Sequence, residues 1–116
     1  MAGGAWCAFD RFNTWQGDFM EKFYATTPLM AETKTCLNAV LWAVRQQWRR
    51  ITIKTDCQVL VQLLQNGKVV EHEVANIIDD IQTCASTFMV CNILKVKRNV
   101  VERAHNIAKL CMSSNS

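Results

Sequence analysis

The chain has 116 residues, of which 50% are hydrophobic and 20% are charged, and its formal net charge is +3. This length fits a single folded domain with its own core, and the composition excludes a wholly disordered chain. The mildly basic charge permits a polyanionic partner but does not require one.

Two strands joined by a hairpin are predicted first. Residues 4–9, GAWCAF, are rich in aromatic and small apolar residues, and residues 19–25, FMEKFYA, form the second strand. Between them, Asn13, Gly17 and Asp18 suit a turn. The second strand is expected to end before Pro28, because proline has no N–H to donate to a neighbouring strand.

The middle of the chain alternates between helical and strand patterns. Residues 30–48 carry apolar side chains at helical spacing, and residues 51–55, ITIKT, form a strand. A short apolar stripe at residues 59–64 predicts a second helix, which Asn66 and Gly67 end. Residues 74–85 repeat the helical spacing and predict a third helix.

The C-terminal part predicts a strand and a last helix. Residues 88–96, FMVCNILKV, are apolar at nearly all positions, so we expect a strand buried on both faces. Helical spacing from Val101 to Cys111 predicts a helix with Asn99 as its N-cap. The order β-β-α-β-α-α-β-α indicates an α/β fold, a mixed sheet flanked by helices. We expect one domain over residues 1–112 and a disordered polar tail at residues 113–116.

Six cysteines are scattered along the chain without the paired spacing of a metal finger. Most of them fall in apolar periodic segments, where a cysteine acts as a small hydrophobic residue. We therefore expect reduced thiols and an intracellular protein, located in the nucleus or the cytoplasm. The sequence shows no secretory signal and no membrane-spanning segment.

Three stretches resemble the RNase H-like fold family, in particular the retroelement-type, reverse-transcriptase-like RNase H domains abundant in plant genomes. MAETKTCLNAVLWAV, residues 30–44, resembles the family's Ala-Glu at the start of its first long helix. IKTDCQVLVQLL, residues 53–64, resembles its strand-Asp-x-Gln-x-Leu-Val-x-x-Leu segment. VKRNVVERAHNIAKLC, residues 96–111, resembles its last helix. The likeness begins at the family's second strand, so we expect an N-terminally truncated RNase H-like domain.

The resemblance implies hydrolysis of the RNA strand of an RNA–DNA hybrid with two Mg²⁺ or Mn²⁺ ions, held by four acidic residues. Carried onto this chain, two of these are Glu32 and Asp56, as catalytic residues and metal ligands. His105 takes the fourth position, where an imidazole would contact a phosphate or shuttle a proton. The first acid belongs to the absent strand, and Asp10 and Asp18 are expected at the wrong end of the sheet. We therefore predict weak activity or none.

In the family the first strand lies between the second and the fourth. Without it the sheet has two facing unpaired edges, and buried backbone groups without partners cost on the order of 1–3 kcal/mol each. Either these edges close on each other, or another segment fills the gap, or the chain folds poorly.

Each candidate residue also has a simpler interpretation. Asp56 fits a helix N-cap, Glu32 a first-turn acid that favours the helix dipole, and His105 a solvent-facing or packed side chain. The basic residues Lys97, Arg98 and Arg103 are candidates for nucleic-acid binding, or form a charged rim. The alternative function is a non-catalytic module that binds nucleic acid or protein. The oligomeric state is not predicted.

Overall fold

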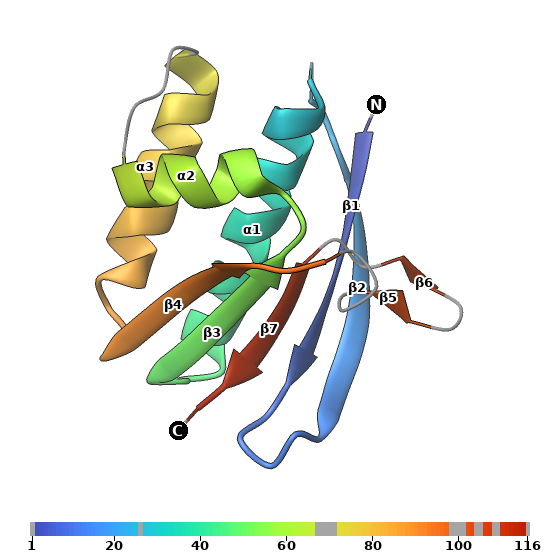
Figure 1. The fold of residues 1–116 in the computed structure, drawn as a ribbon, viewed down its shortest axis with the longest axis vertical. Helices are drawn as coiled ribbons and strands as arrows, with labels where there is room; N and C mark the ends of the chain where they lie inside the picture. Colours follow the sequence, from blue (N-terminus) through green and yellow to red (C-terminus); the bar gives the residue numbers. More distant parts are fainter. Residues whose placement is uncertain are drawn as a thin grey trace.

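The computed structural model describes residues 2–25, 27–66, 72–97, 102–103, 106–107 and 110–115 (Figure 1). Its elements, in chain order, are β1 (Ala2–Phe9), β2 (Trp15–Phe23), α1 (Pro28–Arg45), β3 (Arg50–Thr55), α2 (Gln58–Asn66), α3 (His72–Ala85), β4 (Val90–Lys95), β5 (Glu102–Arg103), β6 (Asn106–Ile107) and β7 (Leu110–Ser114). The elements from β1 to β4 match the predicted types and order. The largest shift is in β2, which begins at Trp15 instead of Phe19.

Five strands form one mixed sheet in the order β2-β1-β7-β3-β4. β1 and β2 are antiparallel, β3 and β4 are parallel, and β7 lies between these two pairs. β7 runs parallel to β1 and antiparallel to β3. The mixed sheet with three helices confirms the predicted α/β class (Figure 1).

The predicted last helix is wrong in the part of the C-terminal region that the structure describes. Residues 102–103, 106–107 and 110–114 are strands, and Ser114, which was expected in a disordered tail, is buried in β7. The reason is the gap between β1 and β3, where two rows of backbone groups need partners. A strand satisfies both rows, and Leu110, Met112 and Ser114 alternate as a strand requires. Of the three outcomes expected for the gap, another segment fills it.

The hydrophobic core lies between the sheet and the helices. Ile51, Ile53 and Thr55 of β3 are buried, whereas Thr52 and Lys54, which point to the other face, are only half-buried. An aromatic cluster extends the core: Trp6 stacks on Phe19 with ring centroids 4.0 Å apart, and Trp42 meets Trp6 edge-on at 5.4 Å. This packing fits the long apolar stripe of α1.

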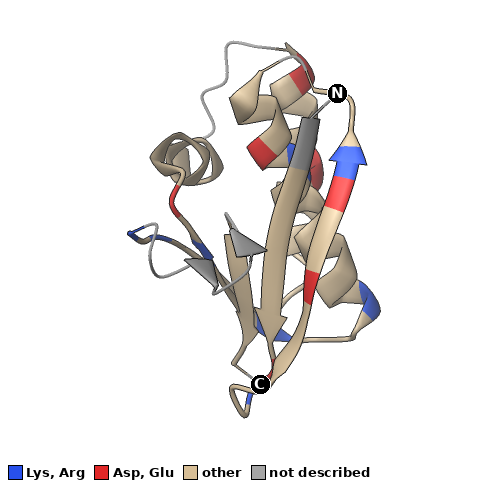
Figure 2. Ribbon diagram, turned by 90° about the vertical axis from the view of Figure 1, so that its right-hand side faces the viewer, with Lys and Arg blue, Asp and Glu red and all other residues tan. Residues whose placement is uncertain are grey.

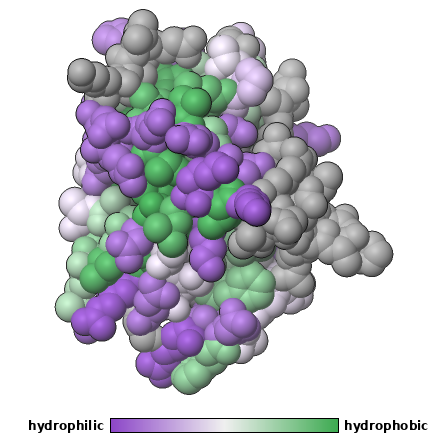
Figure 3. Space-filling view, viewed as in Figure 1, coloured by the Kyte–Doolittle hydropathy of each residue, from purple (hydrophilic) through white to green (hydrophobic). Residues whose placement is uncertain are grey.

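β4 is the edge strand of the sheet, and its burial differs from the prediction. Val90, Asn92 and Leu94 are exposed, while Cys91 and Ile93 on the opposite face pack against the core. The strand is therefore not buried on both faces, because α1 and α3 lie on one side of the sheet (Figure 1). Figure 3, in the same orientation as Figure 1, shows polar and apolar side chains interspersed on the face turned toward the viewer. None of the helices described is long and apolar enough to cross a membrane.

Candidate functional site

Several elements meet at one end of the sheet. Thr55, the last residue of β3, pairs with Lys95 at the end of β4 and with Leu110 at the start of β7. A pocket of about 60 Å³ opens there, lined by Gly4, Pro28, Ala31, Glu32, Thr35, Thr55 and Leu110. The start of α1 therefore faces the carboxyl end of β3.

Local sequence sets where α1 begins. Thr27 is the N-cap, its side chain accepts a hydrogen bond from the Met30 N–H at 3.1 Å, and Pro28 follows at the first turn. The first turn of α1 contains no acidic residue, so Glu32 lies beyond it. The interpretation of Glu32 as a first-turn acid is therefore wrong, and Glu32 instead belongs to the lining of the pocket.

Gly4 allows β1 to come close to α1 beside this pocket. A Cβ atom at this position would lie 1.7 Å from the Thr35 Oγ1 atom and 2.9 Å from the Thr35 Cβ atom. No side chain fits there without moving the strand or the helix. The pocket therefore depends on this close approach.

The turn after β3 is organised by Cys57 rather than by Asp56. The Cys57 sulfur accepts a hydrogen bond from the Leu60 N–H at 3.4 Å, and the Cys57 carbonyl accepts one from the Val61 N–H at 3.3 Å. The Thr55 Oγ1 atom in turn accepts a hydrogen bond from the Cys57 N–H at 3.1 Å. Cys57 thus takes the N-cap position of α2, and the capping interpretation of Asp56 is wrong.

Glu32 and Cys57 are in direct contact. The Cys57 thiol donates a hydrogen bond to the Glu32 carboxylate. Burial raises the pKa of Cys57 to about 11, and the bond to Glu32 adds to the rise because it stabilises the protonated thiol. Glu32 therefore touches Cys57 and shares a pocket with Thr55. These two residues directly follow and directly precede Asp56 in the sequence. The two predicted acids are thus brought to the same end of the sheet.

The donor set limits which ions fit here. Among the described residues no group of three or more His, Cys, Asp or Glu side chains fits a metal ion. Burial also raises the pKa of Cys36 to about 12, and a protonated thiol is not a metal ligand. Two carboxylates suit a single Mg²⁺ or Mn²⁺ ion that takes its other oxygens from water and substrate phosphates. They do not suffice for a complete two-ion site.

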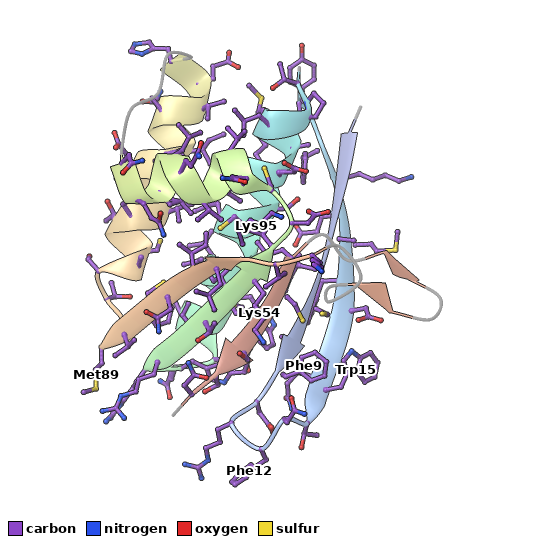
Figure 4. The ribbon with its side chains drawn as sticks, in the orientation of Figure 1. Phe9, Phe12, Trp15, Lys54, Met89 and Lys95 are labelled. Atoms are coloured by element: carbon purple, nitrogen blue, oxygen red, sulfur yellow. The ribbon has the colours of Figure 1, made fainter. Side chains whose placement is uncertain are left out.

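The structure describes the remaining predicted site residues to different extents. Lys97 is exposed just beyond β4, and Lys95 lies at the end of that strand, beside β3 (Figure 4). Figure 2 shows basic segments at this end of β4. Arg103 is described only through its backbone in β5. His105 and Arg98 lie outside the described residues.

Asp10 and Asp18 have structural partners elsewhere. The Asp10 carboxylate accepts hydrogen bonds from the Phe12 and Thr14 N–H groups, both at 2.9 Å, which holds the hairpin turn. Asp18 lies within β2 and accepts a hydrogen bond from the Trp15 indole at 3.1 Å. Asp10 therefore lies at the opposite end of β1 from the pocket, as predicted.

Sequence reasoning missed Cys57. Its signal was available, because Cys57 lies two residues before the apolar stripe and directly before the first residue of α2, where a capping residue is expected. Cysteine is an uncommon N-cap residue, whereas aspartate is a common one. For this reason the N-cap was predicted at Asp56, one residue too early. The contact between Cys57 and Glu32 joins segments distant in the sequence, so no local pattern predicts it.

The comparisons with known proteins agree with this architecture. Residues 2–111 match the protein family described as reverse transcriptase-like. The solved structure of RNase H1 from the halophilic archaeon Halobacterium salinarum NRC-1 is similar, with a TM-score of 0.76 and 15% identity over 91% of this chain and 93% of that chain. A comparison with curated protein sequences found no match. The chain has the RNase H fold, and it belongs to the reverse transcriptase-like family of RNase H-like domains.

Proposed function

We propose that this chain binds RNA–DNA hybrids and that Glu32 and Asp56 hold a divalent ion against the RNA backbone, with weak hydrolysis or none. The observation that carries the proposal is the position of Glu32, which contacts Cys57 and shares a pocket with Thr55, on either side of Asp56. Family membership supports the substrate class.

The chemistry of the site fits this role. Carboxylate oxygens are the ligands that Mg²⁺ and Mn²⁺ prefer, and the bound ion would polarise a phosphate oxygen and favour ionisation of water. Glu32 and Asp56 are two of the four acids that the resemblance implies. The Cys57 thiol already occupies part of the hydrogen-bonding capacity of Glu32. Ion binding is therefore weak alone and stronger when substrate phosphates complete the coordination.

Basic side chains beside the pocket favour a polyanion. Lys95 and Lys97 are exposed at the end of β4, next to the strand that leads to Asp56. Their contacts to phosphates release counterions, so the affinity for a hybrid decreases as salt increases. Contributions from Arg98, Arg103 and His105 remain predictions.

A cleavage and binding assay with a labelled RNA–DNA hybrid tests the proposal. With Mg²⁺ or Mn²⁺ we expect salt-dependent binding and slow or undetectable cleavage. Any residual cleavage decreases by at least about tenfold in Asp56→Asn and Glu32→Gln. Asp79→Asn and Asp80→Asn, on the exposed side of α3, are matched controls and leave binding and cleavage unchanged.

Three outcomes are distinguishable. Turnover comparable to that of a complete RNase H, lost in Asp56→Asn, would show that the proposed low activity is wrong. Binding without cleavage, and with no response to the ion, indicates a non-catalytic nucleic-acid-binding module. Absence of affinity for the hybrid at low salt excludes the nucleic-acid role and leaves a protein-interaction module.

A further inference from the structure

Cys7 of β1 and Cys111 of β7 face each other at the joint that closes the sheet. The two residues are register partners in the parallel pairing of these strands, so their side chains lie on the same face. Their sulfur atoms are 2.7 Å apart, within hydrogen-bond contact in which either thiol is the donor. Neighbouring strands lie about 4.8 Å apart, which is within the roughly 4.4–6.8 Å Cα separation of disulfides.

We propose that Cys7 and Cys111 are a modification site, a thiol pair that a peroxide oxidises to a disulfide, which fixes β7 covalently in the centre of the sheet. The pairing requires no rearrangement of the strands. Cys111 is half-buried whereas Cys7 is buried, so Cys111 is the sulfur that a small oxidant reaches first.

The reaction takes place in two steps. The Cys111 thiolate attacks one oxygen of hydrogen peroxide, the O–O bond breaks, and the released hydroxide takes up the thiol proton as water, which leaves a sulfenic acid on Cys111. The Cys7 sulfur then attacks the Cys111 sulfur, the S–S bond forms, and the hydroxide leaves with the Cys7 proton as a second water. Two thiols lose two electrons and two protons, and one peroxide becomes two waters.

Two other core thiols are poor sites for oxidation. Burial raises the pKa of Cys36 to about 12, and burial also raises the pKa of Cys91. The thiolate is the form that reacts with peroxide, so these two sulfurs react slowly. Cys84 lies on α3, a helix outside the sheet.

The cross-link would act on the strand that forms part of the candidate site. Leu110, the residue before Cys111, pairs with Trp6 of β1 and Thr55 of β3, and it lines the pocket that contains Glu32. A disulfide one residue away would restrict separation of β7 from β1 and so keep Leu110 in place. This inference does not depend on nuclease activity.

Peptide mapping of the whole chain tests the proposal. The reduced protein is treated with hydrogen peroxide, remaining thiols are blocked with iodoacetamide, and the non-reduced digest is analysed by mass spectrometry. We expect a cross-linked peptide that contains Cys7 and Cys111, lighter by two hydrogens and separated by dithiothreitol. Because the two residues are 104 positions apart, oxidation also raises Tm, by roughly 5 °C or more.

Substitutions give the matched comparison. Cys111→Ser and Cys7→Ser abolish the cross-link and the peroxide-dependent rise in Tm, whereas Cys84→Ser retains both. The map of the unsubstituted chain decides the question even if Cys7→Ser folds poorly. Conversion of Cys111 to sulfinic acid while Cys7 remains open to alkylation would overturn the proposal, as would a cross-link that joins other cysteines.

Discussion

The Cys57 sulfur donates a hydrogen bond to the Glu32 carboxylate and accepts one from the Leu60 N–H. One side chain therefore ties α1 to the first turn of α2, at the position where the chain leaves β3. Any cation that binds Glu32 competes with this thiol.

Replacement of Cys57 tests that competition. Cys57→Ala removes the donor to Glu32, so we expect Mn²⁺ affinity to increase a few-fold, as measured by titration calorimetry. Loss of the cap also lowers the free energy of unfolding by about 1 kcal/mol. Cys57→Ser, the matched control, keeps a donor and a good capping group, and both quantities stay close to their original values. Equal Mn²⁺ affinity in the alanine and serine variants would contradict the competition.

Gly4→Ala tests the close approach of β1 to α1. The added Cβ lies 1.7 Å from Thr35 Oγ1, so the strand or the helix must move. We expect the free energy of unfolding in urea to decrease by about 1–3 kcal/mol. Adding Thr35→Ala removes the nearest atom and recovers part of the loss. The adjacent Ala5→Ser, whose side chain points to the other face, is the control and has a smaller effect.

A pair of substitutions tests the central position of β7. Met112 is fully buried and faces the core, whereas the neighbouring Ser113 is half-buried on the other face. Met112→Asp buries a charge without a partner, so we expect a loss of more than about 3 kcal/mol in the free energy of unfolding, and Ser113→Asp costs far less. Urea denaturation followed by circular dichroism measures both. Similar costs for the two variants would exclude the strand pairing described here.

Alkaline pH tests the buried thiols. The pKa values of Cys36 and Cys57 are raised from 9.0 to about 12 and about 11, so the folded chain keeps these protons at pH values where the unfolded chain has lost them. The stability that they contribute is complete below about pH 9 and is lost as pH increases toward 12, because the unfolded state then binds fewer protons. Denaturation between pH 8 and about 11 measures the slope.

Cys36→Ala identifies the source of that slope. Without this thiol the decline of the free energy of unfolding at alkaline pH becomes shallower. A slope that is the same in Cys36→Ala and in the unsubstituted chain would contradict the assignment.

The sequence predicted the elements from β1 to β4 because each carries its own local period. Ile51, Ile53 and Thr55 alternate as a strand facing a core, and the stripes of α1, α2 and α3 follow helical spacing. The C-terminal segment carries two periods, a helical one that includes Cys111 and a strand alternation from Leu110 to Ser114. The choice between them depends on the unpaired edges of β1 and β3, which lie far away in the sequence.

The site was predicted less completely than the fold. Glu32 and Asp56 were found through the resemblance, and only the folded chain shows that Cys57 contacts the first and caps the helix after the second. The simpler interpretations of both acids failed for local reasons: α1 begins two residues earlier than expected, and the N-cap of α2 lies one residue later than expected. Short signals place helix ends with limited precision.

The central strand of this sheet, β7, follows the other four strands of the sheet in chain order. β1 pairs only with β2 and β7, and β3 only with β4 and β7, among the strands that the structure describes. The strands β1, β2, β3 and β4 are all synthesised before Leu110, so the edges of β1 and β3 that face the centre of the sheet stay without a partner until β7 has been made. Such late closure by a distant segment is typical of slow folding, and unpaired strand edges favour aggregation for as long as they stay exposed.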